Sequence, residues 1–370
     1  MMLRATDWVE VRSKEEILAT LDENGRLEGL PFMPQMLQYC GQRFQVFKRA
    51  GKTCSEVRGP TGVVYVSRRL RDTVHLEHRC DGRAYGGCQA GCLIFWKEAW
   101  LKHVDATASR GHRTRELDRA STPNGSSCCT EDQVRAATTY RGPDNDVRYS
   151  CQATQLMDST TALKWWDARQ YVEAYRSGNN SLSTVLKGLV YLVYYYGTLA
   201  RSPRLGAVSR WVYDRFQSVW GGLPFPRKPG KIAAGQIPPR LDMDLKPGEL
   251  VRVKSYEQIL ETLDSSASNR GLSFDAELVP YCGKVFRVRT RIEHFVDEKT
   301  GKMLKMKTPA VILEGVYCQS LYSGQRMLCP RAVFLWWREI WLERVSESGI
   351  ARFGQEKGGC LETIGAADHW

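Results

Sequence analysis

Five cysteines in the first hundred residues have the spacing that most clearly suggests chemistry. Cys80, Cys88 and Cys92 lie on one glycine-rich segment, RCDGRAYGGCQAGC, and Cys40 and Cys54 precede it. Thiolates bind zinc and iron–sulfur clusters, and four ligands complete a structural tetrahedral site. The glycines allow the segment to fold tightly around an ion. We expect Cys80, Cys88 and Cys92 to bind a metal with Cys40 or Cys54 as fourth ligand, zinc being preferred to an iron–sulfur cluster.

Two other interpretations of these thiols stay open. Their spacing differs from the paired CxxC knuckles of many zinc sites, and cysteine is among the residues most often buried, so the thiols could simply belong to a core. A reactive thiolate is the third interpretation, and it requires a depressed pKa. We expect Cys128, Cys129 and Cys151, which lie in or beside a polar stretch, to be bystanders.

A second, weaker set of candidate ligands lies near the C-terminus. It consists of Cys282, Cys318 and Cys329, with His294 as a possible fourth ligand. Imidazole nitrogen and thiolate sulfur both suit zinc. Because these residues are widely spaced and need an imported ligand, we expect this set to be a degenerate copy of the first.

The two sets of thiols belong to an internal duplication. Residues 8–49 and 250–291 align without a gap, and 18 of the 42 aligned positions are identical. Each copy then continues through cysteines to a tryptophan-rich segment, FWKEAWL in the first and WWREIWL in the second. The alignment pairs Cys40 with Cys282, Cys80 with Cys318 and Cys88 with Cys329. The tryptophans are expected to anchor this segment in the core.

The elements that position the thiols follow from the pattern within each copy. Alternating valines predict a short strand at the start of both, at Val9–Val11 and Val251–Val253. A short helix follows, with the three-residue spacing of a capping box. Further strands are expected at 62–66, 73–77, 303–306 and 310–314. This pattern predicts an α+β protein with two homologous SH3-like small β-barrel repeats separated by a helical module. An unrelated α+β arrangement is the alternative.

Changes in composition divide the chain into six segments. We expect repeat 1 with its cysteine-rich loop at 8–104, a polar irregular linker at 105–157, a helical module at 158–222, a linker rich in proline and glycine at 223–248, repeat 2 at 249–346 and a C-terminal tail at 347–370. Within the helical module, residues 182–200 (LSTVLKGLVYLVYYYGTLA) form an apolar run. Its lysine, glycines and tyrosines are unusual in a lipid-facing helix. Packing in the core or against another copy is expected, with membrane contact as the alternative.

Composition sets limits on the partners. The 370 residues are 42% hydrophobic and 25% charged, as in soluble globular proteins, and the net charge is +12. Such a charge favours acidic partners without selecting one. The first residues lack a basic segment followed by an apolar run, so no secretory signal is expected. Reduced thiols and a cytoplasmic location are therefore expected.

The sequence contains no organised catalytic motif. A P-loop, a GxGxxG turn, an HExxH helix and a GxSxG elbow are all missing from it. We therefore expect a non-enzymatic metal-binding accessory or scaffold protein that recruits a protein partner. One alternative is a nucleic-acid-binding protein that uses the basic runs Ser67–Arg71 and Arg287–Arg291. The other is an enzyme that uses a thiolate or a metal-bound water in the Cys80–Cys92 region. The sequence leaves the oligomeric state open.

Overall fold

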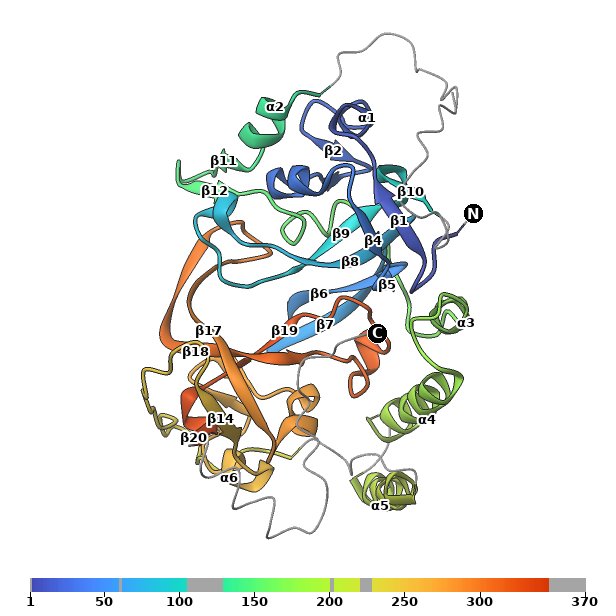
Figure 1. The fold of residues 1–370 in the computed structure, drawn as a ribbon. Coiled ribbons are helices and arrows are strands. Elements are labelled where there is room, and N and C mark those ends of the chain that lie inside the picture. The colour runs from blue at the N-terminus through green and yellow to red at the C-terminus, as the bar shows by residue number, and fades with distance from the viewer. Residues whose placement is uncertain (1, 60–61, 105–128, 200–202, 220–227, 346–370) are drawn as a thin grey trace. The chain divides into compact units, whose positions relative to one another are not determined.

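The structure is a computed structural model that describes residues 2–59, 62–104, 129–199, 203–219 and 228–345 (Figure 1). The chain forms two compact units. The first unit runs to Lys187 and also includes residues 296–304 and 328–331 from the second sequence copy. The second unit contains the rest of the described chain. The boundaries of these two compact units therefore differ from the segment boundaries expected from composition.

The first sequence copy consists of short strands, one short α-helix and 3₁₀ turns. In chain order its elements are β1 (Trp8–Val11), α1 (Lys14–Leu18), β2 (Arg26–Leu27), β3 (Leu30–Pro31), η1 (Pro34–Tyr39), β4 (Arg43–Gln45), β5 (Lys48–Arg49), β6 (Lys52–Gly59), β7 (Gly62–Arg69), β8 (Thr73–Arg79), η2 (Arg83–Tyr85), β9 (Leu93–Lys97), η3 (Glu98–Trp100) and β10 (Leu101–His103). The strands expected at 62–66 and 73–77 are present and somewhat longer than expected.

The second copy repeats this order with longer strands. Its elements are β14 (Leu250–Val253), α6 (Tyr256–Leu260), β15 (Ser268–Asn269), β16 (Leu272–Ser273), η4 (Ala276–Tyr281), β17 (Val285–Val296), β18 (Met303–Tyr317), η5 (Gly324–Arg326), β19 (Phe334–Trp337), η6 (Glu339–Trp341) and β20 (Leu342–Arg344). The two strands expected at 303–306 and 310–314 are one continuous strand, β18.

The segment between the copies is more regular than its composition suggests. It contains α2 (Glu131–Ala136), β11 (Thr139–Arg141), β12 (Val147–Tyr149), β13 (Thr161–Ala162), α3 (Arg169–Arg176), α4 (Leu182–Leu199) and α5 (Pro203–Val219). The first helix of the expected helical module starts only at Arg169, because Thr161 and Ala162 pair with β7 as a strand. Residues 105–128 of the expected polar linker lie outside the described residues.

The two copies share a strand order. The second forms a five-stranded sheet in the order β19-β18-β17-β14-β20, and the first has the same order divided into two sheets, β10-β1-β4 and β5-β8-β9. Where the second copy has the hairpin of β17 and β18, the first copy has an interrupted one, in which β5 pairs with β8 and β6 pairs with β7. The prediction of a mixed α+β chain with a helical middle segment is confirmed. Within the described ranges, none of these antiparallel sheets closes into a barrel.

Equivalent side chains make equivalent bonds in both copies. The Trp100 indole donates to the Thr20 hydroxyl over 3.1 Å, and the Trp341 indole donates to the Thr262 hydroxyl over 2.9 Å. One phenylalanine ring meets each of these indoles edge-on at 5.2 Å, Phe32 in the first copy and Phe274 in the second. The expectation that the tryptophans are core anchors is confirmed, since Trp96, Trp100, Trp337 and Trp341 are fully buried.

The duplication extends to caps and ion pairs. Ser13 and Ser255 both form complete capping boxes at the start of their helices. Arg49 pairs with Glu98, and at the equivalent positions Arg291 pairs with Glu339. Both carboxylates lie in the 3₁₀ turn that carries the anchoring tryptophan, so the ion pair and the indole fix the same turn.

We predict that the Trp–Thr hydrogen bond contributes measurably to the stability of each copy. Thr262→Val leaves the buried Trp341 indole N–H without its acceptor, which costs about 1–3 kcal/mol. Thr262→Ser keeps the hydroxyl and should cost much less. Urea unfolding followed by tryptophan fluorescence measures both variants, and Thr20→Val tests the equivalent bond in the first copy. A Thr262→Val protein as stable as the wild type would contradict this role.

Candidate functional site: a thiol cluster and a buried cationic pocket

The cysteine-rich segment of the first copy connects two paired strands. Cys80 follows β8 and Cys92 precedes β9, and the Cys80 amide donates to the Cys92 carbonyl over 2.8 Å. Between them the chain makes a tight loop in which the Cys88 amide donates to the Tyr85 carbonyl over 3.1 Å. The strand pair therefore holds the two ends of the loop together.

Glycine is required at one position of this loop. Gly82 has φ of 71°, in the left-handed region, and a Cβ there would collide with the backbone of Cys88. Only a residue without a side chain adopts this conformation so close to another backbone segment without strain. The sequence therefore specifies a compact loop that brings Cys88 back towards Cys80.

A fourth thiol, that of Cys151, joins the three cysteines of the loop. Cys151 lies just after β12, and its amide donates to the Thr154 hydroxyl over 2.9 Å. The four thiols are near enough to influence one another: Cys88 and Cys151 act on Cys80, Cys80 and Cys151 act on Cys92, and Cys88 acts on Cys151. We call Cys80, Cys88, Cys92 and Cys151 the thiol cluster.

Burial controls the ionisation of the thiol cluster. It raises the pKa of Cys80 to about 12, and it raises the pKa of Cys92 and of Cys151 above the ordinary thiol value. The neighbouring thiols add to each of these rises, while the nearby Arg331 guanidinium lowers the pKa of Cys92. Without a metal, Cys80, Cys92 and Cys151 are therefore protonated at neutral pH.

Two sulfurs of the cluster already accept hydrogen bonds from N–H groups. The Gln35 side-chain amide donates to the Cys80 sulfur over 3.2 Å, and the Val296 backbone amide donates to the Cys88 sulfur over 3.3 Å. Hydrogen bonds of this kind orient and stabilise metal-bound thiolates. They are therefore the contacts expected around sulfur ligands.

The four sulfurs do not form a ready metal site in this structure. In the part of the chain that the structure describes, no three His, Cys, Asp or Glu side chains form a group close enough to hold a metal ion. No disulfide joins any of the ten described cysteines. Coordination by all four sulfurs would need them to move closer together.

The two expected fourth ligands, Cys40 and Cys54, lie on elements that precede the loop. Cys40 ends η1, where burial and the nearby Glu15 carboxylate raise its pKa. Cys54 lies on β6, and its carbonyl accepts a 2.8 Å hydrogen bond from Arg331. Sequence reasoning missed Cys151, because only the fold brings residues so distant in sequence to the loop. Cys128, one of the other expected bystanders, lies outside the described residues.

The candidates of the second copy are dispersed. Cys282 ends η4, and burial raises its pKa to about 12. The Cys318 sulfur lies 3.4 Å from the Ser320 hydroxyl, His294 lies within β17, and Cys329 belongs to the first unit.

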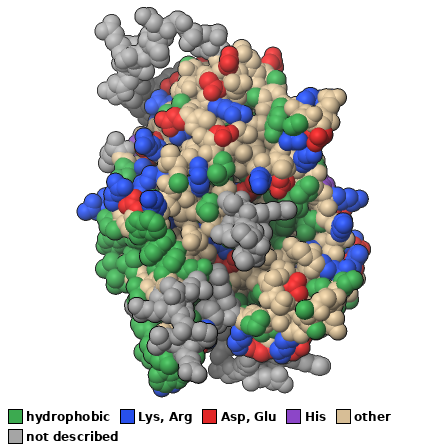
Figure 2. Space-filling view, turned by 180° about the vertical axis from the view of Figure 1, so that it is seen from behind, with side chains coloured by type: hydrophobic (Ala, Val, Ile, Leu, Met, Phe, Trp, Pro, Cys, Tyr) green, Lys and Arg blue, Asp and Glu red, His purple; other side chains and the backbone are tan. Residues whose placement is uncertain are grey.

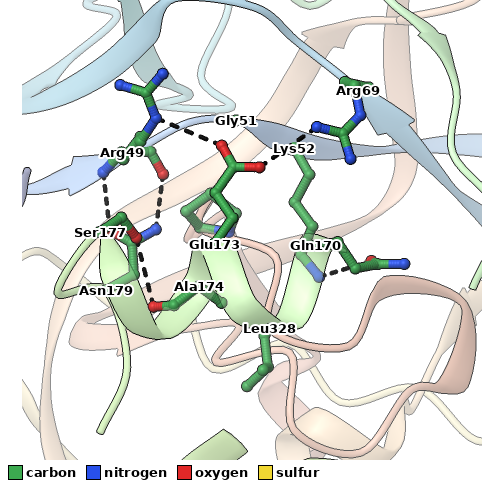
Figure 3. Close-up of a pocket in the computed structure, with 11 residues that line it drawn as sticks. Arg49, Gly51, Lys52, Arg69, Gln170, Glu173, Ala174, Ser177, Asn179 and Leu328 are labelled. Atoms are coloured by element: carbon green, nitrogen blue, oxygen red, sulfur yellow. Dashed lines mark hydrogen bonds and ion pairs between the residues drawn. The ribbon is translucent and has the colours of Figure 1, made fainter. Parts of the chain in front are cut away.

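A pocket in the first unit gathers three buried or half-buried cations (Figure 3). Arg49 on β5 and Arg69 on β7 both pair with the Glu173 carboxylate of α3, at 3.4 and 3.3 Å. Lys52 on β6 points towards the same helix and donates to the Gln170 side-chain carbonyl over 3.0 Å. The enclosed cavity is about 20 Å³, which is room for about one water molecule. The pocket therefore ties α3 to these strands and is too small for a substrate.

Lys52 is the most perturbed group of this pocket. Burial lowers the pKa of its amine to about 8, although the nearby Cys329, Glu173 and Cys54 act in the opposite direction. The Tyr171 ring, 5.3 Å away, partly replaces the lost water. The folded protein thus holds a lysine that loses its proton more easily than in the unfolded chain.

We predict a measurable pH dependence from Lys52. Its folded pKa, about 8, lies below its ordinary value of 10.5, so the burial penalty is complete below pH 8. The penalty disappears as the pH rises from 8 to 10.5, because the folded state releases the proton first. The stability of the wild type relative to Lys52→Met should therefore rise over this window, by up to roughly 3 kcal/mol. Urea unfolding of both proteins at several pH values measures the difference, and a difference that stays constant would contradict it.

Comparison with known proteins gives no relative from which a function could be transferred. No protein family model matches the chain, and no curated protein matches it significantly. Any function has to be argued from the chain's own residues and contacts.

Proposed function

We propose that the chain is a non-enzymatic accessory protein whose first unit binds one structural metal ion, zinc in preference to an iron–sulfur cluster, at the thiol cluster. One observation carries the proposal: four thiols from two distant segments gather where two sulfurs already accept N–H hydrogen bonds. Zinc closes such a site with four sulfur ligands at about 2.3 Å. Zinc also favours the thiolate over the thiol, so binding would release the protons that burial otherwise retains.

The surroundings of the cluster suit the charge that a metal site would have. A Zn²⁺ ion with four thiolates carries a net negative charge, and the buried Arg331 guanidinium acts on Cys92 from nearby. Arg331 is itself held by Glu298 at 2.5 Å and by the Cys54 carbonyl. A fixed buried cation of this kind reduces the electrostatic cost of burying the site.

A comparison with the second copy supports a cross-link in the loop of the first. In the second copy, the loop after β18 is held by a 2.7 Å ion pair between the buried Arg326 and Asp275, and by the Glu277 carboxylate, which accepts from the Tyr322 amide over 2.6 Å. Gln35 is the equivalent of Glu277, and its partner in the first copy is the Cys80 sulfur. The same loop is thus fixed by charge in one copy, and we propose that it is fixed by metal in the other.

The enzyme alternative has weaker support. A nucleophilic cysteine needs a lowered pKa, whereas burial raises the pKa of Cys80, Cys92 and Cys151. A catalytic zinc keeps an open coordination position for water. Four sulfur ligands would leave no such position.

The nucleic-acid alternative depends on basic runs that are engaged within the protein. Arg69 pairs with Glu173 and Asp167, and Arg291 pairs with Glu339 and Asp242. The Arg289 guanidinium lies over the Phe334 ring at 5.1 Å. Phosphate binding by these side chains would have to compete with existing ion pairs, which favours a protein partner over nucleic acid.

The proposal keeps the SH3-like interpretation of the two copies and a cytoplasmic location. Support for the first comes from the second copy, where four sequential strands are followed by β20, which returns to pair with β14. Adjacent first and last strands are the arrangement by which a small sheet curls towards closure. The cytoplasmic location is supported by the ten described cysteines, none of which forms a disulfide.

We predict about one equivalent of tightly bound zinc per chain, measured by elemental analysis of protein purified without added metal. Cys151→Ser should remove most of it and lower the thermal stability, because metal binding free energy contributes to folding. Cys40→Ser is the matched control. It changes another partly buried thiol of the first copy, outside the thiol cluster, and should retain the metal.

An absorption spectrum distinguishes the two metal centres, since zinc is colourless and an iron–sulfur cluster is brown. Wild-type protein without metal would overturn the metal-binding proposal. Equal metal content in Cys151→Ser and Cys40→Ser would overturn the assignment of the fourth ligand.

A further inference from the structure

The two long helices of the middle segment expose an unusual amount of apolar surface. Among the described residues, nine of the twenty large hydrophobic side chains that are exposed lie on α4 and α5. Figure 2 shows hydrophobic side chains gathered over this helical part of the chain. The nine are Leu182, Leu186, Leu189, Val190, Val193, Val208, Trp211, Val212 and Val219. We call them the apolar stripe.

The faces of α4 and α5 opposite the apolar stripe pack against other parts of the chain. Tyr194 stacks on Tyr213 of α5 at 4.2 Å, and Tyr191 meets the same ring edge-on at 5.8 Å. Tyr191 also donates to the Tyr322 carbonyl over 3.1 Å. Helix α4 is thus apolar on its packed face and again on the face that meets water. A helix that is hydrophobic all round is normally buried, so a further surface should cover the stripe.

The intervals between the residues of the apolar stripe indicate that another helix packs against it. On α4, Leu182, Leu186, Leu189 and Val193 follow one another at intervals of four, three and four residues. This is the 3.5-residue period of a coiled-coil seam. On α5, Val208, Val212, Arg215 and Val219 repeat these intervals. Side chains with this period interdigitate with those of a facing helix.

We propose that a second copy of the chain covers the apolar stripe, so that the α4–α5 pairs of two chains form a four-helix bundle. A second copy presents an identical stripe and is always present at equal concentration, which suits a twofold, self-complementary interface. The four-helix bundle is the usual way in which such helix pairs bury apolar faces. Nine side chains of this size offer an area of the same order as the roughly 800 Å² per partner of a stable interface.

Charge favours this occupant over a membrane surface. Helices that lie on a bilayer carry many lysines and arginines on their polar face. Lys187 is the one charged residue in the sequence of α4, and α5 contains three arginines, Arg204, Arg210 and Arg215, with Asp214 between the last two. Two α4 helices can therefore meet without bringing clusters of like charge together. No helix in the described ranges is long and apolar enough to cross a membrane.

Light scattering coupled to size-exclusion chromatography of the full chain in reducing buffer tests the proposal. The wild type should have twice the mass of one chain. Val193→Glu, at a position 76% exposed in one chain, places two carboxylates in the dimer seam. It should weaken the dimer about 100-fold or more, and Leu189→Glu should do the same. Val172→Glu, an exposed helical valine of α3 outside the stripe, is the matched control and should leave the dimer intact.

Each result decides the question, with circular dichroism verifying that the variants are folded. A monomeric wild type, or a Val193→Glu protein that stays dimeric, overturns the proposal. A monomeric wild type that sediments with vesicles containing phosphatidylglycerol, with a blue shift of tryptophan emission, would identify a bilayer as the cover instead. Metal content plays no part in these readouts, so they are independent of the thiol cluster.

Discussion

Each copy depends on one buried tryptophan whose ring packs against a phenylalanine and whose indole N–H donates a hydrogen bond. Trp100 and Trp341 are fully buried, each contacts a phenylalanine edge-on, and each donates to a threonine of the preceding helical turn. The 3₁₀ turn that carries the indole also carries the glutamate of a buried Arg–Glu pair. A single short turn thereby joins the first helix to the last strand pair. The strands that position the thiols, β8 and β9, are placed by this turn, since β9 leads directly into it.

A buried, hydrogen-bonded anchor of this kind explains why the duplication survives in structure with fewer than half of the aligned positions identical. Only the residues that form the anchor, the helix caps and the left-handed turns must be kept. Gly29 and Gly271 both have φ near 80°, and Gly41 and Gly283 both have φ near 75°. Between these fixed points the strands vary in length, so the hairpin that is continuous as β17 and β18 in the second copy is interrupted in the first, as β5 with β8 and β6 with β7.

Local signals allowed the mixed α+β class and the helical middle segment to be predicted from the sequence, and long-range contacts limited the rest. The capping serines, the alternating valines and the buried tryptophans all follow from period and residue type. The place of Cys151 does not, because it lies 59 residues beyond Cys92 and in a stretch whose composition resembles a linker. The expected start of the first middle helix was wrong for a similar reason. Pairing of Thr161 and Ala162 with β7 extends the chain where local propensity favours a helix.

The two copies differ in the side chains that hold the loop before their last strands. Both must fix the loop that precedes the last strands, and both approach it from the same 3₁₀ turn, through Gln35 in the first copy and Glu277 in the second. In the second copy Arg326 and Asp275 supply opposite charges that hold the loop. In the first copy the equivalent of Asp275 is Met33, which offers no charge. The first copy thus lacks this ion pair, but its loop contains three cysteines and lies near a fourth from a distant segment. This difference between the copies supports the proposal of a metal in the first.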